Sequence, residues 1–210
     1  MKVLLVNGSP NKNGCTNRAL EEVAGTLNNE GIETEIYWIG NKPISGCIAC
    51  RKCAEKGKCA IDDIVNDFID RAETADGFIF GSPVHYAAAG GAITSFMDRA
   101  FFSARMSKRD YFYLKPAACV VSARRAGTTT AFDQLNKYFT ISEMPVISSQ
   151  YWNNVHGSNP EEVNKDMEGL QIMRTLGRNM AWFLKCKEAG KKAGVQLPKR
   201  EDFIPTNFIR

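Results

Sequence analysis

The sequence predicts an α/β fold in which a parallel sheet lies between two layers of helices. Short apolar runs without polar alternation, such as residues 3–6 and 77–81, are typical of strands that are buried on both faces. Each run precedes a longer segment whose apolar residues recur at helical spacing. Strands that alternate with helices fold as parallel sheets, because their crossover connections are right-handed.

The first half of the chain carries three of the expected strands. They are predicted at residues 3–6, 32–39 and 77–81, and the third is expected to stop at Ser82 and Pro83. A first helix is expected over residues 16–27, because Leu20, Val23 and Leu27 share one face and Gly31 follows the segment. A cysteine-rich loop spans about 43–60, and Asp63 then begins a helix over residues 64–74.

The second half continues the alternation. Strands are expected at residues 116–121 and 145–147, and helices at 91–104 and 130–139. A helical extension follows from about 160 to 189, while residues 197–210 show no clear period. Five strands fit the flavodoxin-like order 2-1-3-4-5, a three-layer sandwich with a five-stranded parallel sheet. We expect residues 1–210 to form one such domain.

Composition excludes several classes of protein. The 210 residues include 27 basic and 23 acidic side chains, so the net charge of +4 is too small to indicate nucleic acid binding. No apolar run approaches the ~18 residues of a membrane span, and the N-terminal run stops at Asn7, too soon for a signal-peptide core. An odd total of 7 cysteines, four of them bunched, is not typical of a secreted disulfide framework. We therefore expect a cytoplasmic protein with reduced thiols.

The loop after the first strand is a candidate phosphate site. Residues 8–17 lead directly into a helix N-terminus, whose free N–H groups and positive dipole end favour an anion. Ser9, Asn11, Thr16 and Asn17 add polar side chains there. Neither the G-x4-G-K-[ST] nor the G-x-G-x-x-G pattern is present. The same residues would also serve as caps of a plain strand-to-helix turn.

Two further loops would lie at the same edge of the sheet. After the third strand, Pro83, Val84, His85 and Tyr86 precede a run of small residues, an arrangement that suits a flat ring close to the backbone. After the fourth strand, residues 124–127 place arginines before a helix, where they would neutralise ligand oxygens. The alternatives are rings that cover the sheet edge and a solvated basic turn.

Three motifs together resemble the flavodoxin-like NAD(P)H-dependent FMN reductases: residues 8–17, residues 81–86, and Phe-Met-Asp-Arg at 96–99. The resemblance covers roughly the first 150 residues. It implies phosphate contacts at Ser9, Asn11, Cys15, Thr16 and Asn17. It implies flavin-ring contacts at Pro83, Val84, His85 and Tyr86, with Arg124, Arg125, Ala126 and Gly127 closing the other edge. Relatives often have Asn at the position of Cys15, and Tyr or Trp at that of His85.

The cysteine-rich loop has the spacing C-x2-C-x2-C-x5-C, formed by Cys47, Cys50, Cys53 and Cys59. Four thiolates in so short a loop suit a [4Fe–4S] cluster, and nearby basic residues would offset their charge. Zinc and free or redox-active thiols are the alternatives. Within the family, this loop is similar to that of the iron–sulfur flavoproteins. Cys119 and Cys186 are expected to be core or inert residues.

The resemblance implies an FMN-dependent oxidoreductase that takes a hydride from NAD(P)H and passes electrons to a small molecule or a redox protein. One alternative is an electron carrier without its own pyridine nucleotide site, and another is a flavin-free redox or metal sensor. The family commonly forms homodimers and homotetramers, in which the aromatic loop at 151–157 would cover a flavin. The alternative for this loop is a hydrophobic staple between the sheet and the final helix. Aromatic residues at 101–113 are read as an interface, and Arg99 is expected to pair with Asp98 or a carbonyl group.

Overall fold

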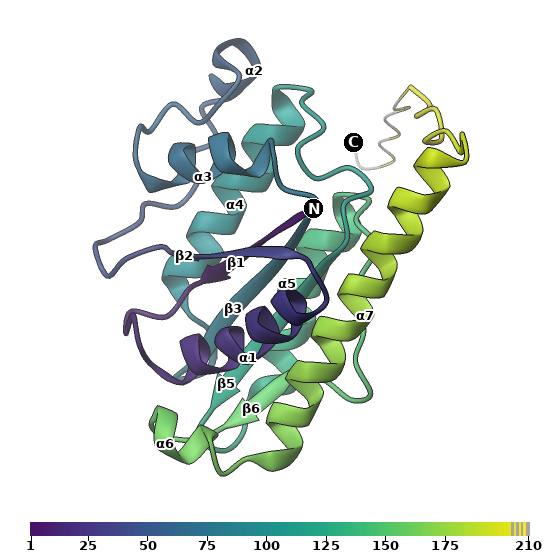
Figure 1. The fold of residues 1–210 in the computed structure, drawn as a ribbon. Helices are drawn as coiled ribbons and strands as arrows, with labels where there is room; N and C mark the ends of the chain where they lie inside the picture. The colour runs from purple at the N-terminus through teal and green to yellow at the C-terminus, as the bar shows by residue number, and fades with distance from the viewer. Residues whose placement is uncertain (203, 205, 207, 209–210) are drawn as a thin grey trace.

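In the computed structural model, which describes residues 1–202, 204, 206 and 208, a sheet lies between two layers of helices (Figure 1). Its parallel strands are β1 (Lys2–Asn7), β2 (Glu33–Trp38), β3 (Gly77–His85), β5 (Ala117–Ala123) and β6 (Asn154–His156). They lie in the order β2-β1-β3-β5-β6, and a short β4 (Ala88–Ala89) pairs antiparallel with β3. The predicted flavodoxin-like order 2-1-3-4-5 of the parallel strands is therefore confirmed.

The continuous apolar runs are explained by burial on both faces of the sheet. On one face, Leu4 and Phe80 pack against α3 (Ile64–Ala72), α4 (Gly91–Met106) and α5 (Thr128–Ile141). On the other face, Leu5 and Ile79 pack against α1 (Cys15–Asn29) and α7 (Met167–Lys192). Neighbouring residues of one strand thus belong to different cores, so both must be apolar.

The packing of α7 against α1 depends on a close approach of the two helices. A Cβ atom at Gly177 of α7 would lie 2.8 Å from Cβ of Thr26, a distance that real side chains do not tolerate. Gly177 therefore permits the close packing of α7 against α1 (Figure 1).

The predicted fifth strand at residues 145–147 is wrong. The strand is β6, and Val146 makes only an isolated bridge to Ala117. At this position the N–H of Ala117 donates to Pro145 and that of Ile147 donates to Ala117. The chain then leaves the sheet and pairs again with β5 through Asn154–His156. The bridge at Val146 and the strand β6 thus lie along the same edge of β5, separated by a loop. Only the segment around Val146 is apolar enough to be predicted as a strand from local sequence.

Other boundaries differ from the predictions in smaller ways. Ser82 and Pro83 do not stop the third strand, because β3 continues to His85 and pairs Pro83 with Ser122. The cysteine-rich loop includes the short helix α2 (Cys53–Lys56), and the C-terminal helical region contains α6 (Pro160–Val163) before α7. The unpatterned region 197–210 contains residues 203, 205, 207, 209 and 210, which lie outside the described residues.

The aromatic residues at 101–113 were expected at an interface, and for three of them this is wrong. Phe101, Tyr111 and Phe112 are buried in the core beneath α3, α4 and α5, and the rings of Phe101 and Phe112 stack with centroids 4.3 Å apart. Cys119 is buried as expected, whereas Cys186 is exposed on α7 rather than in the core. Across the described part of the chain, no helix has the length and apolarity that a membrane crossing requires.

Candidate functional site

A cavity of about 750 Å³ opens at the carboxyl ends of β1, β3 and β5. It brings together residues from three loops that are far apart in the sequence. Seven of the predicted site residues line it: Ser9, Asn11, Cys15, Thr16, Pro83, Val84 and Arg124. The edge at which parallel strands end is the usual position of a ligand in an open α/β sheet. The expected convergence of these loops is therefore present.

The N-terminus of α1 forms one wall of the cavity. Its first turn contains no acidic residue, and Gly14 at the N-cap supplies no side-chain acceptor. The preceding turn is fixed internally, because Ser9 Oγ accepts from the N–H of Asn11 and the N–H of Gly14 donates to Asn11. The first N–H groups of a 15-residue helix thus face the cavity region without a side-chain cap, an arrangement that suits an anion.

Two side-chain contacts tie α1 to the neighbouring loops. The hydroxyl groups of Thr16 and Ser122 share a buried hydrogen bond at 2.8 Å. Cys15 Sγ donates to the carbonyl oxygen of Gly157 at 3.4 Å. Burial raises the pKa of the Cys15 thiol, and the carboxylates of Glu162 and Glu161 add to this shift, so the thiol stays protonated and can donate. The first turn of α1 is therefore braced against β5 and the segment after β6.

Six residues predicted at this site do not line the cavity. His85, Tyr86, Arg125, Ala126 and Gly127 are exposed beside it. Asn17 is also directed elsewhere, because it accepts from Asn7 and donates to Glu21. Gly127 nevertheless adjoins the cavity wall, since a Cβ atom there would lie 3.0 Å from Val84 Cγ1.

Tyr86 occupies the tip of the tight hairpin between β3 and β4. Its φ of 61° lies in the left-handed region, which costs a non-glycine residue roughly 1 kcal/mol. The side chain is fully exposed, although Tyr86 directly follows a buried strand. A strained, uncovered ring at the rim of a cavity is typical of a functional position rather than of a packing residue.

A second, smaller cavity of about 20 Å³ lies under the cysteine-rich loop. All four cysteines of the predicted metal site, Cys47, Cys50, Cys53 and Cys59, line it together with Arg99 and Phe102 of α4. Burial raises the pKa of the Cys53 thiol, and the neighbouring Cys59, Cys50 and Cys47 raise it further. Within the described residues, no group of three or more His, Cys, Asp or Glu side chains is arranged to hold a metal ion. The four thiols that line this cavity are nevertheless the type of donor that a thiolate-bound metal centre requires.

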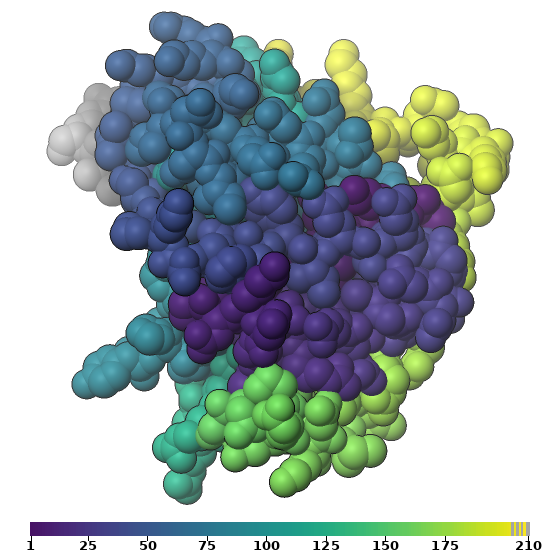
Figure 2. Space-filling model, turned by 60° about the vertical axis from the view of Figure 1, so that its left-hand side comes forward, coloured from purple at the N-terminus to yellow at the C-terminus, as the bar shows by residue number. Residues whose placement is uncertain are grey.

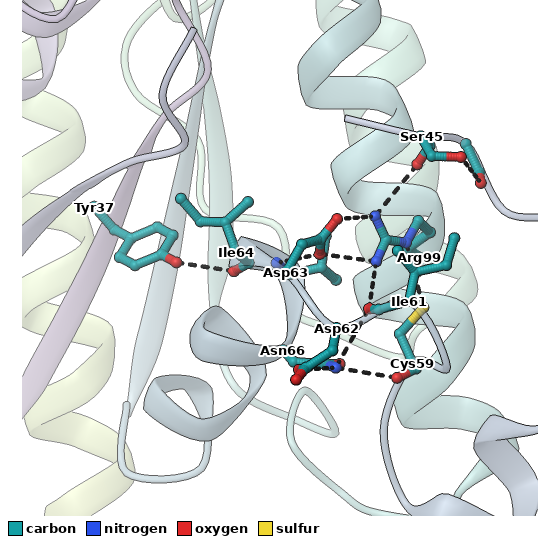
Figure 3. Close-up of polar contacts among 11 residues, drawn as sticks. Tyr37, Ser45, Cys59, Ile61, Asp62, Asp63, Ile64, Asn66 and Arg99 are labelled. Atoms are coloured by element: carbon teal, nitrogen blue, oxygen red, sulfur yellow. Dashed lines mark hydrogen bonds and ion pairs between the residues drawn. The ribbon is translucent and has the colours of Figure 1, made fainter. Parts of the chain in front are cut away.

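Arg99 closes the cysteine cavity from the side of α4 (Figure 3). Its guanidinium donates to both carboxylate oxygens of Asp63 and to Cys59 Sγ. The expected pairing with Asp98 is wrong, because Asp98 accepts from Tyr138 instead, while the expected bond to a carbonyl group is present at Ile61. Burial acts to lower the pKa of Arg99, but the hydrogen bonds to Asp63 and Cys59 hold it above its ordinary value.

The two cavities occupy different parts of the molecule. Figure 1 places α2, within the cysteine-rich loop, at the opposite end from α6, which borders the larger cavity. The two cavities share no lining residue. In Figure 2 the dark purple turn after β1 lies between the steel-blue region of α2 and α3 and the green region of α6.

Residues 1–158 match the family described as NADPH-dependent FMN reductase. This match covers more than half of the 210-residue chain. The chain belongs to the NADPH-dependent FMN reductase family. The expected family relationship is thereby confirmed, and it places the chain among the FMN-dependent oxidoreductases.

Relatives of this FMN reductase family member include iron–sulfur flavoproteins. One from Methanocaldococcus jannaschii is 32% identical over 194 residues, which are 88% of this chain and 98% of that protein. Two solved structures show a similar fold: a WrbA-like flavodoxin from Agrobacterium tumefaciens and a flavoenzyme NAD(P)H:(acceptor) oxidoreductase from Paracoccus denitrificans. The first has a TM-score of 0.62 and 15% identity over 88% of this chain and 98% of that one. The second has a TM-score of 0.63 and 16% identity over 88% of this chain and 97% of that one.

Some residues that line the cavity of about 750 Å³ were not among the predicted contacts. Lys12, Ser122 and residues 157–160 also line it. Lys12 directly follows the predicted contact Asn11, and Ser122 lies two residues before the predicted contact Arg124. Their proximity to predicted contacts could have indicated them from the sequence. Residues 157–160 carried only a weaker signal, because the aromatic loop at 151–157 was expected to cover a ligand.

Proposed function

We propose that the chain binds FMN in the cavity at the carboxyl edge of the sheet and uses it to oxidise NAD(P)H. The observation that carries this proposal is the uncapped N-terminus of α1 facing a cavity of about 750 Å³ in a member of the FMN reductase family. Ser9, Asn11, Cys15, Thr16 and Asn17 form the phosphate end. For Cys15 and Asn17, whose side chains are engaged elsewhere, the backbone N–H is the proposed contact.

The flavin ring is proposed to lie against Pro83 and Val84, with His85 and Tyr86 moving over it from the rim. The exposed, strained conformation of Tyr86 supports this role, because contact with a ring would bury a side chain that now has no cover. Arg124, Arg125, Ala126 and Gly127 are proposed to close the other edge. The arginine side chains would there offset negative charge that develops on the ring oxygens.

Bound FMN supplies the redox chemistry, accepting a hydride from NAD(P)H and returning electrons to a small-molecule or protein acceptor. The protein's own part is to hold the phosphate at α1, to orient the ring on β3 and to limit the access of water from the rim. No acid or base side chain is assigned to the hydride step, since hydride transfer itself requires none.

We further propose that Cys47, Cys50, Cys53 and Cys59 hold a [4Fe–4S] cluster. The placement of all four thiols around one hollow supports this, as does the name of the relative from Methanocaldococcus jannaschii. The alternatives for this loop are bound zinc and free thiols, and iron and zinc analysis distinguishes them from the cluster. A cytoplasmic location is proposed as well, because an odd total of 7 cysteines, four of them bunched, is not typical of a secreted disulfide framework.

A second candidate function is an electron carrier that has no pyridine nucleotide site of its own. The resemblance to iron–sulfur flavoproteins favours it, because both redox groups could then be loaded and discharged by other proteins. In either case we propose a homodimer or homotetramer. Tyr151 and Trp152, exposed near the edge strand β6, offer aromatic surface for such an assembly.

The test is anaerobic purification followed by a visible spectrum, iron and zinc analysis, and rapid mixing with NADH and NADPH. We expect flavin bands, about four irons per chain and bleaching by at least one nucleotide. If the flavin is present but neither nucleotide bleaches it, the electron-carrier function is favoured over the reductase function. A colourless protein with bound zinc would overturn both in favour of a metal-binding sensor.

A further inference from the structure

Arg99 is among the largest fully buried side chains of the protein, although it carries a permanent charge. Its guanidinium makes five hydrogen bonds (Figure 3). Two reach the carboxylate of Asp63, at 2.7 and 2.8 Å, and one reaches Cys59 Sγ at 3.3 Å. The others reach the carbonyl oxygens of Ile61, at 2.9 Å, and Ser45, at 3.4 Å. Each of the three guanidinium nitrogens thus has a partner, which explains how the buried charge is tolerated.

These partners lie on both sides of the four cysteines. Ser45 precedes Cys47, the first of them, while Cys59 is the last and Ile61 follows it. Between these points the chain has little regular structure of its own, since α2 spans only Cys53–Lys56. One side chain of α4 therefore connects the two ends of the cysteine segment, defined as residues 45–61, to the body of the protein.

Asp63 fixes the guanidinium in this position. It also caps α3, because its Oδ1 accepts from the N–H of Val65. The two terminal nitrogens of Arg99 bind Asp63 as a fork, which leaves Nε to donate to the sulfur of Cys59. Cys59 Sγ therefore faces the positive guanidinium of Arg99, and the carboxylate of Asp63 binds the other two nitrogens of that guanidinium.

We propose that Arg99 is the positioning residue of the cysteine site. It holds the two ends of the cysteine segment together before metal binds, and its N–H group at Cys59 raises the reduction potential of the bound cluster. The second statement rests on the cluster in the proposed function, whereas the first does not. Hydrogen bonds to cluster sulfurs favour the reduced, more negative state, so their removal lowers the potential.

The first part is tested by hydrogen exchange on the FMN-loaded, iron-free full chain. Arg99→Lys can still pair with Asp63 but cannot reach Cys59, Ile61 and Ser45 at once. We expect amides of the cysteine segment to exchange at least tenfold faster in this variant, with no change in α1. Arg71→Gln is the matched control, because Arg71 binds Asp67 of α3 and Glu35 without contacting the segment. Unchanged exchange in Arg99→Lys would overturn the positioning role.

The second part is tested by redox titration after anaerobic reconstitution with iron and sulfide. Arg99→Lys is expected to lower the cluster potential and Asp63→Asn to raise it, since the latter removes the counter-charge while an Asn still caps α3. A merely structural role would not give shifts of opposite sign. Equal potentials, or shifts of one sign, overturn this part. If wild-type protein takes up no iron, the proposed cluster and the potential effect both fail, while hydrogen exchange still decides whether Arg99 holds the segment.

Discussion

The hydroxyl group of Thr16, in the first turn of α1, lies 2.8 Å from that of Ser122, near the end of β5. Both residues are buried, with exposed fractions of 1% and 3%. The bond therefore joins the first turn of α1 to β5, the strand that ends at the opposite edge of the cavity. A buried hydroxyl group that loses its partner costs about 1–3 kcal/mol, so this pair has a measurable role in shaping the cavity.

Replacing either partner should destabilise the protein. Thr16→Val and Ser122→Ala are each expected to lower the free energy of unfolding by about 1–2 kcal/mol, because each leaves one buried hydroxyl group unpaired. The double variant should cost less than the sum of the two, since no unpaired group remains. Urea unfolding of the four proteins measures this coupling, and strictly additive losses would show that the bond carries no energy.

A negative charge next to the N-terminus of α1 should weaken FMN binding without unfolding the helix. Asn13 is exposed, lines the cavity of about 750 Å³ and directly precedes Gly14 at the N-cap. Asn13→Asp is expected to reduce FMN affinity about tenfold by repelling the phosphate, whereas the helix dipole should leave stability equal or slightly higher. Asn13→Ser is the neutral control. Equal affinity of the Asp and Ser variants would place the phosphate elsewhere.

The flavin and metal sites should be separable by mutation. Cys53→Ser is expected to reduce iron from about four per chain to less than half of that, because a serine hydroxyl is a poor substitute for a thiolate ligand. FMN content should stay unchanged, since the cysteine cavity and the cavity of about 750 Å³ share no lining residue. Cys186→Ser, at an exposed thiol on α7, provides the control. Loss of flavin together with iron would contradict the separation.

Stability should depend on pH through Lys115, which donates to the carbonyl oxygens of Ala72 and Glu73 at the end of α3. Burial lowers the pKa of Lys115 from 10.5 to about 8, although Asp76 opposes the shift. The folded pKa lies below the unfolded one, so the unfolded chain binds more protons between these values. The contribution of Lys115 to stability therefore rises with pH across this window.

The measurement is the free energy of unfolding of wild type and Lys115→Met at about pH 7.5 and about pH 10. We expect wild type to gain about 1 kcal/mol relative to the variant, a value reduced from the full shift because Lys115 is partly exposed to solvent. The comparison with the variant cancels other groups that titrate at alkaline pH. A constant difference between the two proteins would show that Lys115 keeps its ordinary pKa when folded.

The strand order was predictable because each central strand is apolar on both faces, and Leu4 and Leu5 belong to different cores. The fifth strand was not predictable from the same signal. Val146 lies in the apolar segment but is half exposed, whereas Val155 is fully buried between polar neighbours. Val155 belongs to a strand because its segment pairs with β5, and such tertiary pairing cannot be predicted from local hydrophobicity.

The site was predictable to the level of loops but not of side-chain directions. Thr16 and Val84 line the cavity, because the segments after β1 and at the end of β3 meet at this edge of the sheet. Spacing could not show that Tyr86 points to solvent from the tip of a hairpin. It could not pair Arg99 with Asp63 either, since 36 positions separate them and only the packing of α3 against α4 brings them together.

The N-terminus of α1 is proposed to hold the phosphate of FMN. This proposal is tested most directly by titrating flavin-free protein with FMN and with riboflavin, which differ only in that phosphate, and following flavin fluorescence. We expect one FMN per chain, bound at least about 100-fold more tightly than riboflavin, because several N–H donors and the helix dipole act on the phosphate alone. Equal affinities for the two flavins would contradict it.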